Sequence, residues 1–134
     1  MCRPLRERKG GRRSSLSVAP RLARGKKIPV LKRGKNLIWF PEGERSPSGV
    51  LQEFKPGLGM LLAHYRVPVI PAFIRGAYEA LPRGRSRPHF TRIVIDFGEP
   101  AITDELIRQG EGEPPERISR GLYERLAALR DKRE

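Results

Sequence analysis

Three stretches of the chain have the apolar pattern of strands. Residues 37–40 are a continuous apolar run, typical of a strand buried on both faces. Residues 67–74 form a second apolar run that predicts a buried strand, and its two prolines predict that the strand pairs only partly along one side. Residues 90–97 predict a third strand with one apolar face, because apolar and polar positions alternate there. The apolar positions are Ile93, Ile95 and Phe97, and the residues between them are Arg92, Val94 and Asp96.

Other stretches have the spacing of helices. Pro56 suits the first position of a helix, and the apolar face that follows is Leu58, Leu61, Leu62 and Tyr65. We interpret Gly57 and Gly59 as places where the backbone comes close to a ligand or a strand, because glycine otherwise weakens a helix. A last helix is predicted from Pro114 to about Arg130, with the apolar stripe Ile118, Leu122, Leu126 and Leu129.

Shorter elements complete the predicted order. Residues 78–81 suit one helical turn, and Gly34 suits the end of a short helix. Thr103 is expected to cap another short helix whose first turn holds Asp104 and Glu105. The pattern as a whole predicts an α/β fold of about three strands flanked by helices over residues 31–134.

Charge divides the chain unevenly. The net charge is +13, yet residues 1–35 hold 13 of the 28 Lys/Arg residues and one acid, whereas residues 36–134 hold 15 bases and 14 acids. Residues 1–27 show neither a helical nor a strand period, so we predict a disordered basic leader over residues 1–30. This leader could attract an anionic membrane face or a nucleic acid, but without aromatic residues among its bases a nucleic-acid partner is not expected.

The cysteine and histidine content suggests neither a disulfide nor a metal site. Cys2 is the only cysteine, and no Cys/His spacing is typical of zinc. A reducing, cytoplasmic compartment is therefore expected. The basic leader makes peripheral contact with the cytoplasmic membrane face an open alternative. No apolar run approaches the length of a membrane span.

Residues 40–57 combine the side chains of a phosphate-binding site. Glu42 and Gly43 follow the first apolar run, at the strand end where α/β proteins place ligands. Arg45 and Lys55 offer two cations for a phosphate, Ser46 adds a hydroxyl, and Glu42 can accept a hydrogen bond from a substrate hydroxyl. The alternative is a solvated turn with charges of both signs, and the residue types alone favour that alternative.

Three ordered blocks resemble the glycerolipid acyltransferases, which acylate glycerol 3-phosphate or 1-acylglycerol 3-phosphate. The block Phe40-Pro41-Glu42-Gly43-Glu44-Arg45-Ser46 is similar to the family's Phe-Pro-Glu-Gly-Thr-Arg-Ser. Phe54-Lys55-Pro56-Gly57 and Val67-Pro68-Val69-Ile70-Pro71 resemble the next two blocks, and the likeness extends from about residue 31 to residue 97.

The resemblance implies roles for these residues. Glu42, Gly43 and Arg45 would hold the glycerol-phosphate head group, with Ser46 and Lys55 nearby. Phe40, Pro41, Gly57, Pro68 and Pro71 would shape the pocket. The implied partners are a lysophospholipid or glycerol-phosphate acceptor and an acyl thioester donor, acyl-CoA or acyl-carrier protein, with no other cofactor. Glu44 departs from the family's threonine, and an acid there would weaken phosphate binding unless it points away.

The family's catalytic His-x-x-x-x-Asp pair has no counterpart here. In the family, the histidine takes the proton of the acceptor hydroxyl and the aspartate orients the histidine. Here Val69 and Val94 stand five residues after His64 and His89, and both histidines follow the first block. We therefore expect residues 31–134 to be the C-terminal part of an acyltransferase-like domain that is inactive alone. The alternatives are a noncatalytic fragment that completes its sheet with another chain, or a basic protein that binds nucleic acid or an anionic surface.

Overall fold

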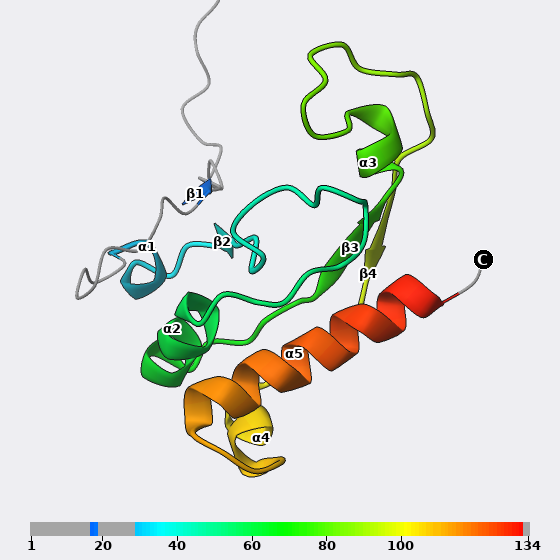
Figure 1. Cartoon of the computed structure of the whole chain (residues 1–134). Coiled ribbons are helices and arrows are strands. Elements are labelled where there is room, and N and C mark those ends of the chain that lie inside the picture. Colours follow the sequence, from blue (N-terminus) through cyan, green and yellow to red (C-terminus); the bar gives the residue numbers. More distant parts are fainter. Residues whose placement is uncertain (1–16, 19–28, 133–134) are drawn as a thin grey trace, which may run out of the picture. The chain divides into compact units, whose positions relative to one another are not determined.

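The computed structural model describes residues 17–18 and 29–132 (Figure 1). These residues belong to two compact units, Met1–Trp39 and Phe40–Glu134, which we describe separately.

The first unit holds two short parallel strands and one helical turn. Strand β1 (Ser17–Val18) pairs with β2 (Leu37–Ile38), and α1 (Pro29–Lys32) lies between them in the sequence. Gly34 follows α1 with a φ of +65°, and its N–H donates to the carbonyl of Leu31, which confirms the predicted helix end. The disordered leader predicted over residues 1–30 stays a prediction; within that range the structure describes β1 and the start of α1. Residues 1–16 and 19–28 lie outside the described residues.

The strand predicted at residues 37–40 is shorter and more exposed than expected. Only Leu37 and Ile38 pair, Ile38 is 36% exposed and Phe40 is 60% exposed. The prediction of a strand buried on both faces is wrong, because an apolar run does not by itself supply the layers that would cover it.

The second unit contains four helices and two strands among its described residues, so the predicted α/β class is confirmed. Their bounds are α2 (Gly57–Tyr65), β3 (Ala72–Arg75), α3 (Ala77–Ala80), β4 (Val94–Phe97), α4 (Thr103–Arg108) and α5 (Pro114–Asp131). The helices predicted near residues 56–65, 78–81 and 114–130 are all present. No helix within residues 29–132 combines the length and the apolar character needed to cross a bilayer.

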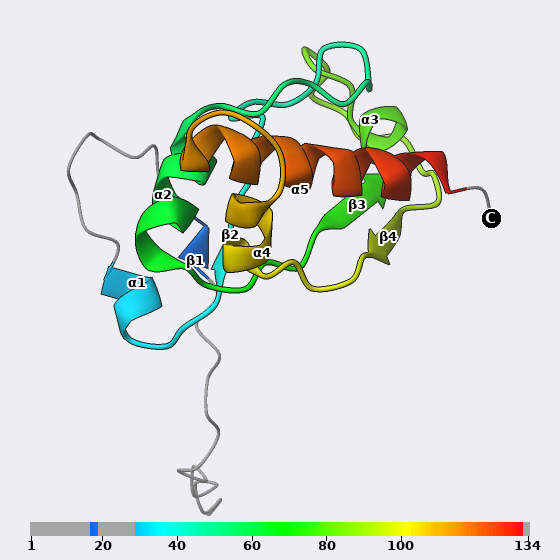
Figure 2. The ribbon, with the colours of Figure 1, turned by 90° about the horizontal axis from the view of Figure 1, so that it is seen from below.

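Helix α5 is the element on which the second unit is assembled. It packs against α2, α4 and β3 (Figure 2). Its stripe supplies Ile118, Leu122 and Leu126 to the core, as the helical spacing predicted. The facing residues are Leu58, Leu61 and Leu62 of α2 and Leu106 of α4.

Glycine lets α2 and α5 approach closely. A Cβ atom on Gly59 would lie 2.1 Å from the carbonyl oxygen of Pro115. The close approach predicted for this glycine is therefore made to a helix, not to a ligand or a strand. Thr103 also differs from its prediction: its hydroxyl donates to the carbonyl of Val67 at 2.7 Å and does not cap α4.

Strands β3 and β4 pair antiparallel, with Ala72 opposite Phe97 and Ile74 opposite Ile95. Farther along, Val69 and Ala101 form an isolated bridge. The second predicted strand, residues 67–74, is thus regular only at Ala72–Arg75, because prolines cannot donate to a ladder. The third, residues 90–97, is regular only at Val94–Phe97.

The sheet face that lies against α5 carries Arg75 and Asp96 together with Phe73 and Val94. Arg75 donates to Asp96 at 2.6 Å and to three carbonyls at the end of α5, those of Leu129 and Arg130 in its last turn and of Lys132 just after it. These carbonyls have no partner within the helix, so the guanidinium satisfies them. The other face leaves Ile74, Ile95 and Phe97 between 40% and 69% exposed. The predicted alternation in β4 is present, but the apolar residues face away from the helix.

Candidate functional site

The first two sequence blocks lie side by side at the start of the second unit. The N–H of Lys55 donates to the carbonyl of Pro41 at 2.8 Å. The N–H of Gly43 donates to the carbonyl of Phe40 at 3.1 Å. Gly43 has a φ of +76°, and a Cβ atom there would lie 3.2 Å from Cγ of Lys55. The aliphatic part of Lys55 therefore lies over Gly43, and the positive φ together with this close approach favours glycine at that position.

Glu42 is half-buried and holds the loop that joins the two blocks. Its Oε2 atom accepts a hydrogen bond from the N–H of Gln52 at 2.9 Å. No donor within the described residues reaches Oε1. One carboxylate oxygen is thus structural, and the other can accept a hydrogen bond from a ligand. Gln52 takes part through its backbone, so no residue-type signal in the sequence could have indicated it.

Ser46 shapes the turn that follows the first block. Its hydroxyl donates to the carbonyl of Val50 at 2.8 Å and accepts from the N–H of Ser48 at 3.4 Å. The turn rests on α3, because the hydroxyl of Tyr78 donates to the carbonyl of Pro47 at 3.1 Å. The serine predicted to help hold substrate is therefore engaged in the loop, and its role toward a ligand stays a prediction.

Near the first block, one acid and one base form an ion pair, and two further cations pair with no carboxylate of residues 29–132. Glu44 forms an ion pair with Arg83 at 3.3 Å, from the loop after α3. Arg45 and Lys55 are exposed, and no carboxylate of residues 29–132 pairs with either of them. The sequence showed a basic loop around Arg83, but only the fold brings it to Glu44. Glu44, which was expected to oppose phosphate binding, is thus paired with the guanidinium of Arg83.

Two of the five predicted pocket-shaping residues adjoin the first two blocks, and the structure does not gather the other three around them. Phe40 and Pro41 adjoin Gly43 and Lys55 through the backbone hydrogen bonds described above. Pro71 is buried elsewhere, where its ring would lie 3.0 Å from a Cβ atom on Gly98. Pro68 is exposed and Gly57, which begins α2, is half-buried. A pocket formed by all five residues stays a prediction.

The two histidines lie outside the loop. His64 is exposed, and its ring meets that of Tyr65 edge-on with centroids 4.8 Å apart. His89 is also exposed. In the part of the chain that the structure describes, no three His, Cys, Asp or Glu side chains cluster as a metal site would require.

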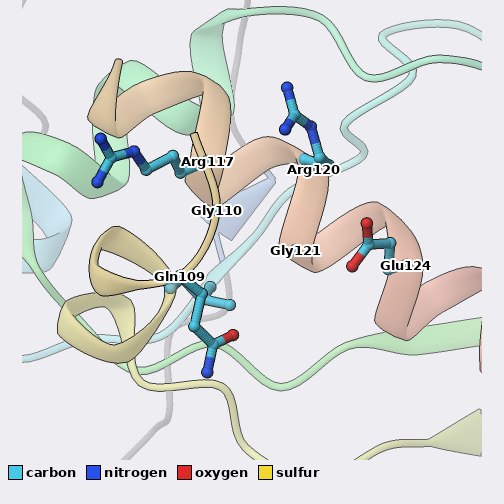
Figure 3. Close-up of a pocket in the computed structure, with 7 residues that line it drawn as sticks. Gln109, Gly110, Arg117, Arg120, Gly121 and Glu124 are labelled. Carbon is cyan, nitrogen blue, oxygen red and sulfur yellow. The ribbon is translucent and has the colours of Figure 1, made fainter. Parts of the chain in front are cut away.

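A pocket of about 90 Å³ lies between α4 and α5, away from these blocks (Figure 3). The guanidinium of Arg117 donates to the carbonyls of Gly112 and Ile107, so its charge holds the α4–α5 connection. None of the predicted site residues lines this pocket. Its lining residues are Leu106, Gln109, Gly110, Arg117, Arg120, Gly121 and Glu124.

Known proteins match this chain in both sequence and fold. It is 33% identical over 76 residues to a 1-acyl-sn-glycerol-3-phosphate acyltransferase of Cocos nucifera, a match that covers 57% of this chain and 25% of that protein. It is 38% identical over 57 residues to the chloroplastic 1-acyl-sn-glycerol-3-phosphate acyltransferase BAT2 of Brassica napus, covering 42% and 17%. The chain therefore spans about a quarter or less of the length of these curated relatives.

A solved structure shares the fold. The crystal structure of the 1-acyl-sn-glycerophosphate acyltransferase PlsC from Thermotoga maritima matches with a TM-score of 0.56 and 25% identity, covering 75% of this chain and 40% of that one. The family model described as Acyltransferase matches residues 6–75, and so begins within the predicted leader, upstream of the resemblance noted near residue 31. Because that range is more than half of the sequence, the chain belongs to the acyltransferase family.

Proposed function

We propose that this chain provides the acceptor-binding part of a 1-acylglycerol-3-phosphate acyltransferase, in which Arg45 and Lys55 bind the acceptor's phosphate. The observation that carries this proposal is the position of Lys55 over Gly43, which brings the second block beside the first. Two cations that pair with no carboxylate of residues 29–132 then stand on the segment that joins the two blocks. The relatives named above act on an acceptor that carries such a phosphate.

Each residue of the loop suits a different part of the head group. The planar guanidinium of Arg45 can donate two parallel hydrogen bonds to phosphate oxygens, and Lys55 adds a compact charge. Gly43 has no side chain to keep a ligand from its backbone. The Oε1 atom of Glu42 can accept a hydrogen bond from a glycerol hydroxyl while Oε2 stays with Gln52. This division of roles favours a phosphorylated polyol over inorganic phosphate.

The reaction needs a base besides these groups. The acceptor oxygen would attack the carbonyl carbon of an acyl thioester, from acyl-CoA or acyl-carrier protein, and the thiol would leave. The hydroxyl proton must pass to a base, which a His-x-x-x-x-Asp pair supplies in the family that this sequence resembles. The 134 residues contain no such pair. We infer that this chain binds the acceptor head group without transferring the acyl group on its own.

Binding of glycerol 3-phosphate and a short-chain lysophosphatidate tests the site. We expect Arg45→Gln or Lys55→Gln to weaken binding about tenfold in titration calorimetry, because each removes one charged contact to phosphate. Arg108→Gln is the matched control: it removes an equal, exposed charge at the end of α4 and should leave the affinity unchanged. Equal effects of all three substitutions would contradict the site.

The inferred lack of transfer is tested separately. The 134-residue chain is incubated with acyl-CoA and lysophosphatidate, and the diacyl product is measured against a reaction without protein. We expect no more diacyl product with the chain than without it. Robust formation with the chain present would contradict the inference and would require a base other than the family's pair.

A further inference from the structure

Residues 82–92 form a basic segment between α3 and β4, which we name the arginine loop. It contains Arg83, Arg85, Arg87 and Arg92 and no acid. The rest of residues 36–134 holds eleven bases and fourteen acids. The positive charge of this part of the chain is therefore concentrated in one loop, against a body of slightly negative charge.

The arginine loop is held at both ends and exposed between them. The N–H of His89 donates to the carbonyl of Ala80 at 2.7 Å. The N–H of Arg85 donates to the carbonyl of Pro82 at 3.1 Å. At its far end the backbone of Arg92 lies against Gly76. Residues 83–92 are all exposed. The loop thus presents its arginines to solvent from a fixed base.

An aromatic residue accompanies these charges. The side chain of Phe90 is fully exposed, and no aromatic or cationic contact within the described residues involves it. Arg85, Arg87 and Arg92 have no acidic partner within residues 29–132, unlike Arg83. An exposed apolar ring among unpaired cations suits the boundary between charged headgroups and acyl chains.

The arginine loop adjoins the candidate site. Arg83 pairs with Glu44 of the first block, and Tyr78 at the base of the loop donates to Pro47. Gly49 also lies against the ring of Tyr78. A surface bound by the arginine loop would therefore lie near the loop that holds Arg45.

We propose that the arginine loop docks this chain on an anionic lipid surface, with Arg85, Arg87 and Arg92 against lipid phosphates and Phe90 at the acyl boundary. The charge of the loop complements an anionic leaflet, which attracts clustered arginines within a short distance of its surface. The choice of lipid over nucleic acid rests in part on the proposed function, whose acceptor is a lipid. The loop also lacks the several aromatic residues that stack bases in single-stranded nucleic acid.

A tryptophan placed at residue 90 reports on the environment of the arginine loop itself. Vesicle binding by the basic N-terminal segment alone would not change its emission. The reporter protein carries Phe90→Trp together with Trp39→Phe, which removes the native tryptophan. It is mixed with phosphatidylcholine vesicles that contain or lack phosphatidylglycerol. We expect a blue-shifted emission, quenched by brominated acyl chains, only with the anionic vesicles. Met60→Trp in the same background, at an exposed position of α2, should show neither change.

Charge variants of that reporter test the arginines. Arg85→Gln/Arg87→Gln should remove at least half of the blue shift at a fixed lipid concentration. Arg108→Gln/Arg120→Gln removes the same charge from exposed positions outside the loop and should keep the shift. Circular dichroism of each variant checks that the fold is retained.

Three results would overturn docking by the arginine loop. They are vesicle binding without a shift at residue 90, equal losses in the two charge variants, and a shift produced by RNA but not by vesicles. Arg45→Gln separates this inference from the proposed function: it should keep the shift at residue 90 and weaken glycerol 3-phosphate binding. If the parent chain shows the shift but does not bind glycerol 3-phosphate, the proposed function alone fails. If it binds glycerol 3-phosphate but shows no shift, docking alone fails.

Discussion

At the scale of single residues, Glu44 is the position in the first block where this chain departs from the family that it resembles. The family that the sequence resembles has threonine at this position, and a carboxylate beside Arg45 would oppose a phosphate. The ion pair with Arg83 at 3.3 Å changes that expectation, because a nearby cation offsets the field of the acid. Both side chains are about half exposed, so the pair adds little to folding stability. We infer that its effect falls on ligand affinity.

A double-mutant cycle tests this inference. Arg83→Gln leaves Glu44 uncompensated and should weaken glycerol 3-phosphate binding about two- to threefold, the effect of one screened charge several ångströms away. Glu44→Gln should strengthen binding by a similar factor, and the double variant should return close to the parent affinity. Titration calorimetry at low salt measures all four proteins. Identical affinities across the cycle would show that the ion pair lies too far from the ligand to matter.

At the scale of elements, the crossing of α2 and α5 determines how the candidate loop is supported. Phe54 of the second block meets the ring of Tyr123 on α5 edge-on, with centroids 5.4 Å apart. One turn into α2, Gly59 brings the two helices together at Pro115. The backbone that carries Lys55 is therefore anchored on α5 just before α2 begins.

Gly59→Ala tests this crossing through the sign of its effect. Helix propensity alone predicts a gain of about 1 kcal/mol from alanine. The contact predicts a loss, because the new Cβ atom would lie 2.1 Å from a backbone oxygen and the helices would have to separate. We expect a net loss of about 1–3 kcal/mol in the free energy of unfolding, measured by urea denaturation. Met60→Ala, at the exposed next residue, should change it by less than about 1 kcal/mol; a stabilised Gly59→Ala protein would contradict the crossing.

The same elements show how far the sequence could predict the fold. The helices at residues 57–65 and 114–131 were predictable because their apolar stripes lie within each helix. The face of the β3–β4 sheet that lies toward α5 was not predictable, because Arg75 of β3 meets Asp96 and the end of α5 only after folding. In the candidate site, the blocks indicated Glu42, Arg45 and Lys55, but not the pairing of Glu44 with a residue 39 positions away.

At the scale of the whole molecule, charge and core lie in different parts of the sequence. Residues 1–30 hold ten bases and one acid, whereas residues 31–134 hold eighteen bases and fourteen acids. All the buried apolar side chains that the structure describes lie between Leu51 and Leu126. The family match nevertheless begins at residue 6, so the basic segment belongs in part to the matched range. The family match, the basic segment and the buried core thus have different boundaries: the match begins at residue 6, the basic segment ends at residue 30, and the core begins at Leu51.

Deleting residues 1–30 tests whether charge and packing are separable. A basic segment binds polynucleotides mainly by releasing their counterions, so any binding of the full chain to RNA should be strongly salt-dependent and should fall at least tenfold on deletion. The urea unfolding midpoint should stay the same, because the core from Leu51 to Leu126 is intact. RNA binding that survives the deletion would place the interaction on residues 31–134. A lowered midpoint would show that residues 1–30, which include β1 and the start of α1, contribute to the stability of the folded chain and are not a leader.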